Sequence, residues 1–162
     1  MYYRSKYYKS LITTWEVAKK FEEATGQKII LHEIETGGTD GFLYDKNTGK
    51  YYDAELKQRQ DYEIKNRAEG NPKYKVLTVP SSTVKTENEL FFIYDLSMEY
   101  VAVFHSSAVD LKNKYKRRQL TEIGWRDIWT ADVDESRIKY FKIWSLFSNY
   151  LKPFLHNIYR SN

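Results

Sequence analysis

Apolar residues recur at helical spacing over residues 10–25. The apolar positions in this stretch are Leu11, Trp15, Ala18, Phe21 and Ala24, which fall on one face of a 3.6-residue repeat. Ser10 is a suitable cap for the first turn, and Gly26 can take the positive φ found just past a helix end. The pattern therefore predicts a first helix over residues 10–25.

Six short segments rich in β-branched and aromatic residues follow the helix and predict strands. They are residues 28–35, 41–45, 50–59, 74–80, 90–95 and 100–105. The second and third segments are joined by Lys46-Asn47-Thr48-Gly49, a turn sequence in which Gly49 can be left-handed. These two strands are therefore expected to pair as a hairpin. Residues 61–70 are expected to form a loop or a short helix, and residues 111–135 show no clear period.

A second apolar stripe at helical spacing occupies residues 136–159. Its members are Ile138, Phe141, Trp144, Phe147, Leu151, Phe154 and Ile158. We expect one long C-terminal helix from Ser136 to Tyr159, kinked at Pro153. The order of helix, strands and helix is typical of a mixed β-sheet with helices packed on it, so the predicted fold class is α/β (α+β). A single domain is expected over residues 1–162, with its core at about residues 10–105 and the basic segment and C-terminal helix at 106–162.

Charged residues interrupt the predicted hairpin at positions that matter for chemistry. Alternation along residues 50–59 puts Leu56 on one face and Glu55 with Lys57 on the other. The hairpin brings Asp40, just before its first strand, close to the second strand. Two acids and a lysine inside a core are costly unless something compensates their charge, and a divalent cation held by the two carboxylates would do so.

Ordinary structural roles stay open for the same residues. A Glu-x-Lys pair is common on the solvent face of a strand, and an Asp that follows Gly-Gly-Thr is a frequent turn former. The combination of apolar strand bodies, a tight turn and a preceding helix favours a functional site over these roles.

The composition limits the chemistry that such a site can use. The chain has 162 residues, a net charge of +4, a pI near 9.0 and no cysteine. The lack of cysteine excludes a disulfide scaffold, a thiolate zinc site and a cysteine nucleophile. With 41% hydrophobic residues, the chain is not wholly disordered. No segment has the pattern of a signal peptide or a membrane span, so we expect a soluble, cytoplasmic protein without a membrane partner. No phosphate-binding or dinucleotide motif is present, so no small-molecule organic cofactor is expected.

The acidic positions and their spacing resemble the PD-(D/E)XK nuclease superfamily. The motif here is Thr39-Asp40, followed 15 residues after the aspartate by Glu55-Leu56-Lys57, with Thr39 where the family has a proline. The resemblance covers about residues 10–105. It implies a restriction-endonuclease-like fold, in which helices flank a mixed sheet.

The resemblance also implies roles for individual residues. Asp40 and Glu55 would bind Mg²⁺, with Mn²⁺ as a substitute, together with the backbone carbonyl of Leu56. Lys57 would orient or deprotonate the attacking water, or stabilise the charge that develops on the phosphate.

In this superfamily the helix before the hairpin often donates a further acid. Glu16 is our candidate, because it lies at the edge of the apolar stripe beside Trp15. Glu22 and Glu23 are its rivals, and the sequence does not separate the three.

A basic run lies beyond the predicted strands. Residues 112–118 contain five cations, which are Lys112, Lys114, Lys116, Arg117 and Arg118. Such runs neutralise backbone phosphates without discriminating between sequences, so these residues are candidates for nucleic-acid binding. A solvated surface is the alternative interpretation.

The function implied by the resemblance is a Mg²⁺-dependent endonuclease that hydrolyses DNA phosphodiester bonds. The small size favours a structure-selective enzyme for branched DNA, such as a Holliday-junction resolvase, or a minimal restriction-type enzyme. A homodimer is expected, because one active site cuts one strand. The alternative is a non-catalytic nucleic-acid-binding or protein-interaction module on a nuclease-like or unrelated α+β fold.

Overall fold

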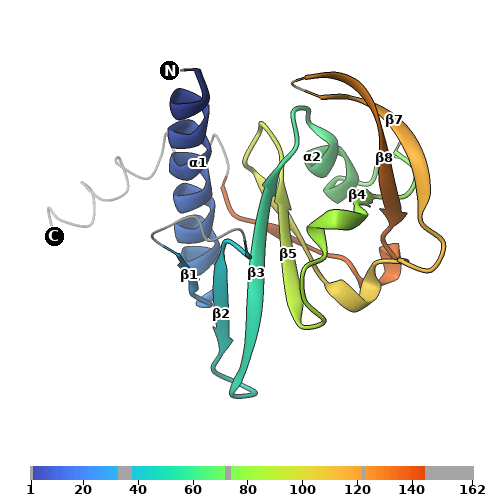
Figure 1. Cartoon of the computed structure of the whole chain (residues 1–162). Helices are drawn as coiled ribbons and strands as arrows, with labels where there is room; N and C mark the ends of the chain where they lie inside the picture. The colour runs from blue at the N-terminus through green and yellow to red at the C-terminus, as the bar shows by residue number, and fades with distance from the viewer. Residues whose placement is uncertain (1, 33–37, 72–73, 122, 145–162) are drawn as a thin grey trace, which may run out of the picture.

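A six-stranded mixed sheet forms the centre of the molecule, with a helix on one face and a small second sheet on the other (Figure 1). The computed structural model describes residues 2–32, 38–71, 74–121 and 123–144, with side chains from residue 12 onward. The strand order is β1-β2-β3-β5-β6-β9 in the large sheet and β4-β8-β7 in the small one. The fold class is therefore mixed α/β, as the sequence predicts.

The first helix, α1 (Tyr2–Thr25), begins earlier than its apolar stripe indicates. It ends where predicted, and Gly26 follows with a φ of 75° while its N–H donates to the carbonyl of Glu22 at 2.8 Å. Ser10 lies inside the helix, so its predicted role as the N-cap is wrong. Among the described residues, no helix combines the length and the hydropathy that crossing a membrane requires.

The predicted hairpin is confirmed. The strands β2 (Gly41–Asp45) and β3 (Lys50–Gln58) pair antiparallel around the turn. The carboxylate of Asp45 closes this turn by accepting hydrogen bonds from the N–H of Asn47 and the hydroxyl of Thr48, each at 2.9 Å. The strand predicted at 28–35 is shorter, β1 (Ile29–Leu31), and pairs with β2. Residues 33–35 lie outside the described part of the chain.

On its other edge, β3 pairs in parallel with β5 (Glu89–Tyr94). Parallel neighbours need a crossover connection, which here occupies residues 59–88. The connection contains α2 (Glu63–Ala68), β4 (Thr78–Pro80) and the 3₁₀ turn η1 (Ser81–Thr83). A further strand, β6 (Tyr100–His105), then returns antiparallel to β5. The last two predicted strands are thus confirmed, and the one predicted at 74–80 keeps only its final three residues.

The predicted C-terminal helix is wrong where the structure describes it. The 3₁₀ turn η3 (Glu135–Arg137) is followed by β9 (Lys139–Lys142), which pairs antiparallel with β6. The apolar residues here follow a strand period, because Tyr140 packs against the core on one face of the sheet and Phe141 against the core on the other. Pairing with the edge of β6 therefore decides the conformation. The remainder of the predicted helix, residues 145–159, lies outside the described residues.

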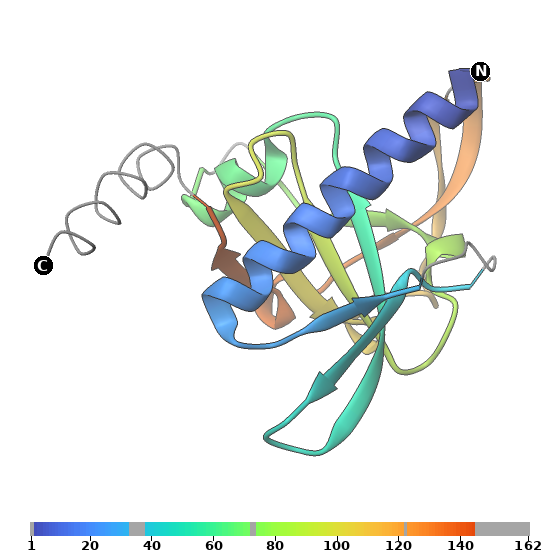
Figure 2. The same cartoon turned by 90° about the vertical axis from the view of Figure 1, so that its left-hand side faces the viewer.

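Two hydrophobic cores lie on the two faces of the large sheet. On one face α1, which crosses the sheet diagonally in Figure 2, buries Val17 and Phe21. The ring of Phe21 meets that of Phe92 edge-to-face, with 5.2 Å between centroids. The opposite face is covered by the small sheet together with α2, whose Ile64 lies in the core on this face. The core between the two sheets includes Val79, Phe91, Ile93, Phe104, Ala131 and Val133.

The small sheet arises largely from the segment in which the sequence pattern predicts no element. The strands β7 (Tyr115–Thr121) and β8 (Gly124–Asp132) form an antiparallel hairpin. Only the end of β8, from Thr130 to Asp132, pairs with β4. The hairpin is therefore joined to the body at one end, and its tip extends beside α2 (Figure 1).

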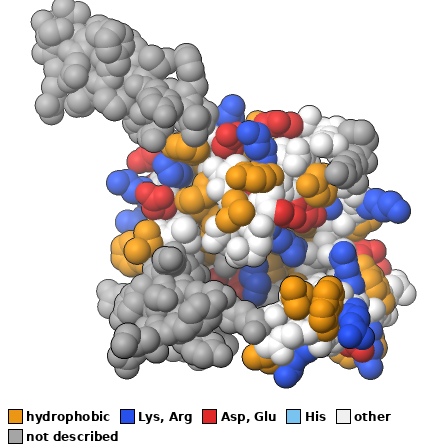
Figure 3. Space-filling view, turned by 90° about the horizontal axis from the view of Figure 1, so that it is seen from above, with side chains coloured by type: hydrophobic (Ala, Val, Ile, Leu, Met, Phe, Trp, Pro, Cys, Tyr) orange, Lys and Arg blue, Asp and Glu red, His pale blue; other side chains and the backbone are white. Residues whose placement is uncertain are grey.

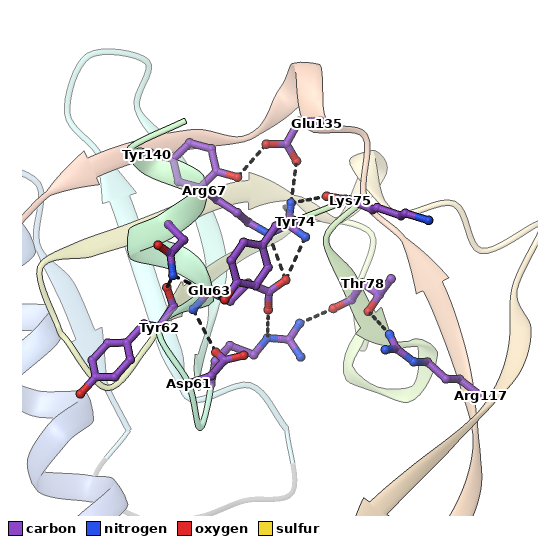
Figure 4. Close-up of polar contacts among 12 residues, drawn as sticks. Asp61, Tyr62, Glu63, Arg67, Tyr74, Lys75, Thr78, Arg117, Glu135 and Tyr140 are labelled. Carbon is purple, nitrogen blue, oxygen red and sulfur yellow. Dashed lines mark hydrogen bonds and ion pairs between the residues drawn. The ribbon is translucent and has the colours of Figure 1, made fainter. Parts of the chain in front are cut away.

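A buried arginine joins α2 to the segments around it (Figure 4). The side chain of Arg67 is 5% exposed and pairs with Glu63 of the same helix at 2.8 Å and with Glu135 of η3 at 3.7 Å. It also donates to the carbonyl of Lys75 at 2.6 Å and lies 5.8 Å from the ring centroid of Tyr74. A buried guanidinium is costly without partners, so these contacts favour one position of α2 against the chain that leads into β4.

Phe21→Ala should lower the free energy of unfolding by about 3–5 kcal/mol, because it empties a fully buried site between two aromatic rings. Ile12→Ala is the matched control on the same helix, since Ile12 is 64% exposed and its loss should cost less than about 0.5 kcal/mol. Urea unfolding followed by circular dichroism measures both. A loss below about 1 kcal/mol for Phe21→Ala would contradict the packing of α1 on the sheet.

Candidate active site

The candidate site lies where β3 extends beyond its pairing with β2. The first residue of β2, Gly41, is opposite Ala54, whereas β3 continues to Gln58. The gap is partly filled by Asp40, whose Oδ2 accepts the N–H of Leu56 at 2.8 Å. A side chain thus takes the place of a strand at this edge, and it holds the Asp40 carboxylate beside the Glu-x-Lys motif.

The backbone of Asp40 is fixed by β1. The N–H of His32 donates to the carbonyl of Asp40 at 2.9 Å, which extends the contact between β1 and β2 by one residue. The strands approach so closely here that a Cβ on Gly41 would lie 2.1 Å from the carbonyl oxygen of Ile30. The glycine after Asp40 is therefore required by a close backbone approach.

The backbone carbonyl of Leu56 faces the same open edge as its N–H. Residues that pair in a sheet direct their N–H and C=O toward the same neighbour. The N–H groups of Asp53 and Arg59 donate to the carbonyls of Asn88 and Tyr94 at 3.0 and 2.8 Å, so this alternate set of β3 residues faces β5. Leu56 belongs to the other set. Its carbonyl therefore points toward the Asp40 side, as its predicted ligand role requires.

Glu55 is buried, with 5% exposure, on the face that the small sheet covers. Its Oε2 lies 3.5 Å from the Nζ of Lys85, which also donates to the carbonyl of Gly38 at 2.7 Å. Burial first, and the nearby charge of Asp40 second, raise the pKa of Glu55 to about 7, although Lys85 and Lys57 oppose this shift. The ionised form of Glu55 is therefore disfavoured, because the two lysines do not fully compensate for burial and for the charge of Asp40.

Lys57 extends from the same face as Glu55, two residues further along β3. The predicted alternation is confirmed, because Ala54 and Leu56 lie in the core under α1 while Glu55 and Lys57 point to the other face. Lys57 is exposed where Glu55 is buried. Its positive charge opposes the rise in the pKa of Glu55.

The helix α1 does not bring an acid to this pair. Glu16 is exposed on α1, whose buried residues pack on the opposite face of the sheet from Glu55. It lines a surface hollow together with Lys65 of α2. Glu22 and Glu23 are exposed on the same helix. The helical stripe predicts contact with the sheet but not which face the hairpin acids use, so the expectation of a further acid from α1 is corrected here.

Lys85 of the crossover and Glu89 of β5 also belong to the site, although no sequence pattern indicates it. Glu89 is fully buried, and its Oε2 accepts the N–H groups of Lys85 at 2.8 Å and Thr86 at 3.3 Å. It thereby holds the loop that brings Lys85 to Glu55. Its Oε1 has no hydrogen-bond partner among the described residues, and burial raises its pKa. Only the parallel register of β3 and β5 places these residues together, which no local pattern reveals.

The five cations of the basic run take three different positions. Lys114, Lys116 and Arg118 share one face of the β7–β8 hairpin, as their contacts with the rings of β8 show. Arg117 points to the other face, toward β4. Lys112 lies in the turn before β7. All five are exposed, so the charge is divided between two faces of the hairpin and its base.

Comparison with protein-family models, with curated proteins and with solved structures finds no match. The resemblance to PD-(D/E)XK nucleases therefore rests on the residues of this chain alone.

The residues present fit a magnesium ion that is bound together with a phosphate. Within the described ranges, no group of three or more His, Asp or Glu side chains is placed to hold a metal. Mg²⁺, however, commonly takes one or two carboxylates and keeps water and phosphate oxygens as its other ligands. Asp40 and Glu55, with the carbonyl of Leu56 on the same edge, would provide that partial set of oxygen ligands.

The raised pKa of Glu55 predicts that the metal-free protein loses stability as the pH rises from about 4.5 to about 7. The folded state holds this proton more tightly than the unfolded chain, so ionisation of Glu55 should cost the folded state about 3 kcal/mol once the pH exceeds 7. Glu55→Gln cannot ionise and should remove the part of the slope that Glu55 contributes, while Glu89, whose pKa burial also raises, keeps its own part. Urea unfolding across that pH range, without divalent cations, measures the effect.

Glu22→Gln is the control for this experiment, because Glu22 is an exposed acid and its replacement should leave the pH slope unchanged. If Glu55→Gln kept the wild-type slope, another group would be responsible and the assignment to Glu55 would be wrong.

Proposed function

We propose that this protein is a Mg²⁺-dependent endonuclease that hydrolyses DNA phosphodiester bonds. The observation that carries the proposal is the pair of carboxylates, Asp40 and Glu55, at the open edge of β3. The carbonyl of Leu56 on that edge and Lys57 on the face of Glu55 support it. The resemblance to PD-(D/E)XK nucleases, drawn from the same residues, points to the same chemistry.

The residues divide the work of phosphodiester hydrolysis between them. When bound, Mg²⁺ or Mn²⁺ would polarise the scissile phosphate and lower the pKa of the attacking water. Asp40 and Glu55 would hold the ion, whose positive charge would oppose the effect of burial and of Asp40 on the pKa of Glu55. Lys57 would hold the attacking water or stabilise the charge that develops on the phosphate oxygens. Lys85, which pairs with Glu55 at 3.5 Å, is a second cation that could contact the phosphate.

We further propose that the enzyme is a homodimer and that its substrate is branched DNA. One site hydrolyses one strand, so cutting a junction or a duplex through both strands takes two sites. Ile12 and Trp15 are exposed on α1 and offer apolar surface for contact between subunits. A Holliday junction presents two equivalent strands to such a dimer.

A non-catalytic nucleic-acid-binding module is the second candidate. The ion pair between Lys85 and Glu55 favours it, because this pair satisfies part of the buried charge without a metal. The basic hairpin would then bind DNA, and the carboxylates would serve the structure of the sheet edge.

Asp40→Asn, Glu55→Gln and Lys57→Ala should each reduce Mg²⁺-dependent cleavage of DNA by at least about 100-fold. The first two variants each remove a carboxylate that would hold the ion, and the third removes the charge that would act on the water or the phosphate. The amide oxygen that Asp40→Asn introduces can still accept the N–H of Leu56, so the fold of this variant should persist. Cleavage of a four-way junction and of a linear duplex with the same sequence, in Mg²⁺ and in Mn²⁺, measures the effect.

Two further variants complete the cleavage experiment. Glu69→Gln, an exposed acid after α2, is the control and should cut like wild type. Glu16→Gln should also keep its activity if α1 contributes no acid. If the wild type cuts neither substrate with either ion, the enzyme proposal fails. If Asp40→Asn cuts like wild type, the enzyme survives but its site lies elsewhere.

Lys116→Gln combined with Arg118→Gln should reduce the slope of log Kd against log salt by about 2, because each lost phosphate contact releases about one counterion fewer. Fluorescence anisotropy of a labelled duplex, with EDTA present to prevent cleavage, measures the slope. Lys46→Gln combined with Lys50→Gln is the matched control, since both lysines are exposed beside the turn between β2 and β3, which lies away from the β7–β8 hairpin (Figure 1). An unchanged slope in the first double variant would show that the basic run does not contact phosphates and is a solvated surface.

A further inference from the structure

Two tryptophans stand exposed on the β7–β8 hairpin. Trp125 is 60% exposed and Trp129 is 48% exposed, both on β8. Large apolar side chains are usually buried, and here the hairpin pairs with the body only at its base, through Thr130 to Asp132. The outer part of the hairpin therefore has no core of its own to explain these rings.

Cations alternate with the rings along the same face. Lys116 is the cross-strand neighbour of Trp129 and lies 5.3 Å from its ring centroid, and Lys114 lies 5.4 Å from the same ring. Arg118 lies 5.9 Å from the ring of Trp125. Figure 3 shows this arrangement at its lower right, where blue and orange side chains lie side by side over the hairpin.

The charge of this face selects the class of ligand. It carries three cations, Lys114, Lys116 and Arg118, against one acid among the described residues, Asp127, which is the cross-strand neighbour of Arg118. An acidic partner is therefore favoured over a neutral apolar one. Aromatic rings interleaved with cations suit a polyanion that also has flat faces to stack, which is the chemistry of unpaired nucleotides.

The spacing of the rings fits a stacked single strand. Trp125 and Trp129 are four residues apart on one strand, which places them about 13 Å apart along β8. Four stacked nucleotides cover a similar length at ~3.4 Å each. In a duplex the bases are paired and stacked on each other, so their faces could not reach the rings without local opening.

A groove connects the tip of the hairpin with the end of β3. Near the tip, Leu120 and Trp125 line this groove of about 910 Å³ together with Arg59, at the end of β3. The groove therefore borders the outer part of the hairpin and the residue that follows β3.

We propose that the β7–β8 hairpin binds a single-stranded DNA segment, with bases stacked on Trp125 and Trp129 and phosphates on Lys114, Lys116 and Arg118. The choice of DNA rests on the proposed nuclease function, and it implies that the preferred substrate carries an unpaired stretch next to the bond that is cut. The stacking surface itself stands on the exposed rings and their cations.

Tryptophan fluorescence tests this binding directly and does not depend on cleavage. In a Trp15→Phe, Trp144→Phe background, the remaining emission comes from Trp125 and Trp129. With EDTA present, a dT12 oligonucleotide should quench this emission and bind at least tenfold more tightly than a 12-base-pair duplex. Trp125→Ala or Trp129→Ala, each made in wild type and followed by anisotropy, should weaken dT12 binding about 5- to 150-fold, which corresponds to the loss of one stacked base. The Trp→Phe changes at the same positions keep a ring and should lose less.

Several results would overturn the proposal. Unchanged dT12 affinity in both alanine variants, or equal affinity for dT12 and duplex, would show that the hairpin reads charge alone. Equal quenching by poly-glutamate would favour an acidic protein partner instead, and tighter binding of rU12 would reject DNA as the ligand. Tyr51→Ala is the matched control and should bind dT12 like wild type, since Tyr51 is 61% exposed but on β3. If the protein binds dT12 but cuts nothing, the hairpin proposal stands and the nuclease proposal fails. If it cuts DNA but its tryptophan variants bind dT12 like wild type, only the hairpin proposal fails.

Discussion

The parallel pairing of β3 with β5 is the constraint on which the rest of the structure depends. Antiparallel neighbours can be joined by a short turn, but parallel neighbours need the chain to return to the same end of the sheet. The return, residues 59–88, carries α2 and β4 across one face and then delivers Lys85 and Glu89 beside Glu55. The loop that neutralises the buried carboxylate and the strand that anchors the small sheet are both parts of this one connection.

The unequal lengths of β2 and β3 create the candidate site. A central strand normally pairs on both edges, and Leu56 would leave its N–H unpaired once β2 has ended. Asp40 meets that need with a carboxylate, which also brings a negative charge close to the buried Glu55. Burial is the main reason that the pKa of Glu55 is raised, and the carboxylate that satisfies this backbone donor raises it further. The carboxylate that meets a structural need at this sheet edge is thus also one of the two on which the proposed metal site depends.

Local patterns predicted the elements that local physics controls. The β2–β3 hairpin follows from the turn around Gly49 and from alternation, so the shared face of Glu55 and Lys57 could be derived from the sequence. Elements that depend on distant partners could not. The stripe around Phe141 suits a helix or a strand, and only the free edge of β6 decides for β9. In the same way, the apolar stripe of α1 shows that it packs on the sheet but not on which face, so Glu16 was expected on the wrong side.

The modest net charge of +4 conceals a separation of charges that the fold maintains. Acidic side chains that lack enough positive partners are buried between the sheets, whereas the cations of β7 are exposed on a hairpin joined to the body through β4. Since β4 belongs to the same crossover that carries Lys85, the position of the hairpin and the environment of Glu55 depend on one segment of chain. A shift of that segment would alter both together, so a ligand that spans the hairpin and the sheet edge would favour a single position of the crossover. Such coupling requires no change within the large sheet, because the segment lies outside it.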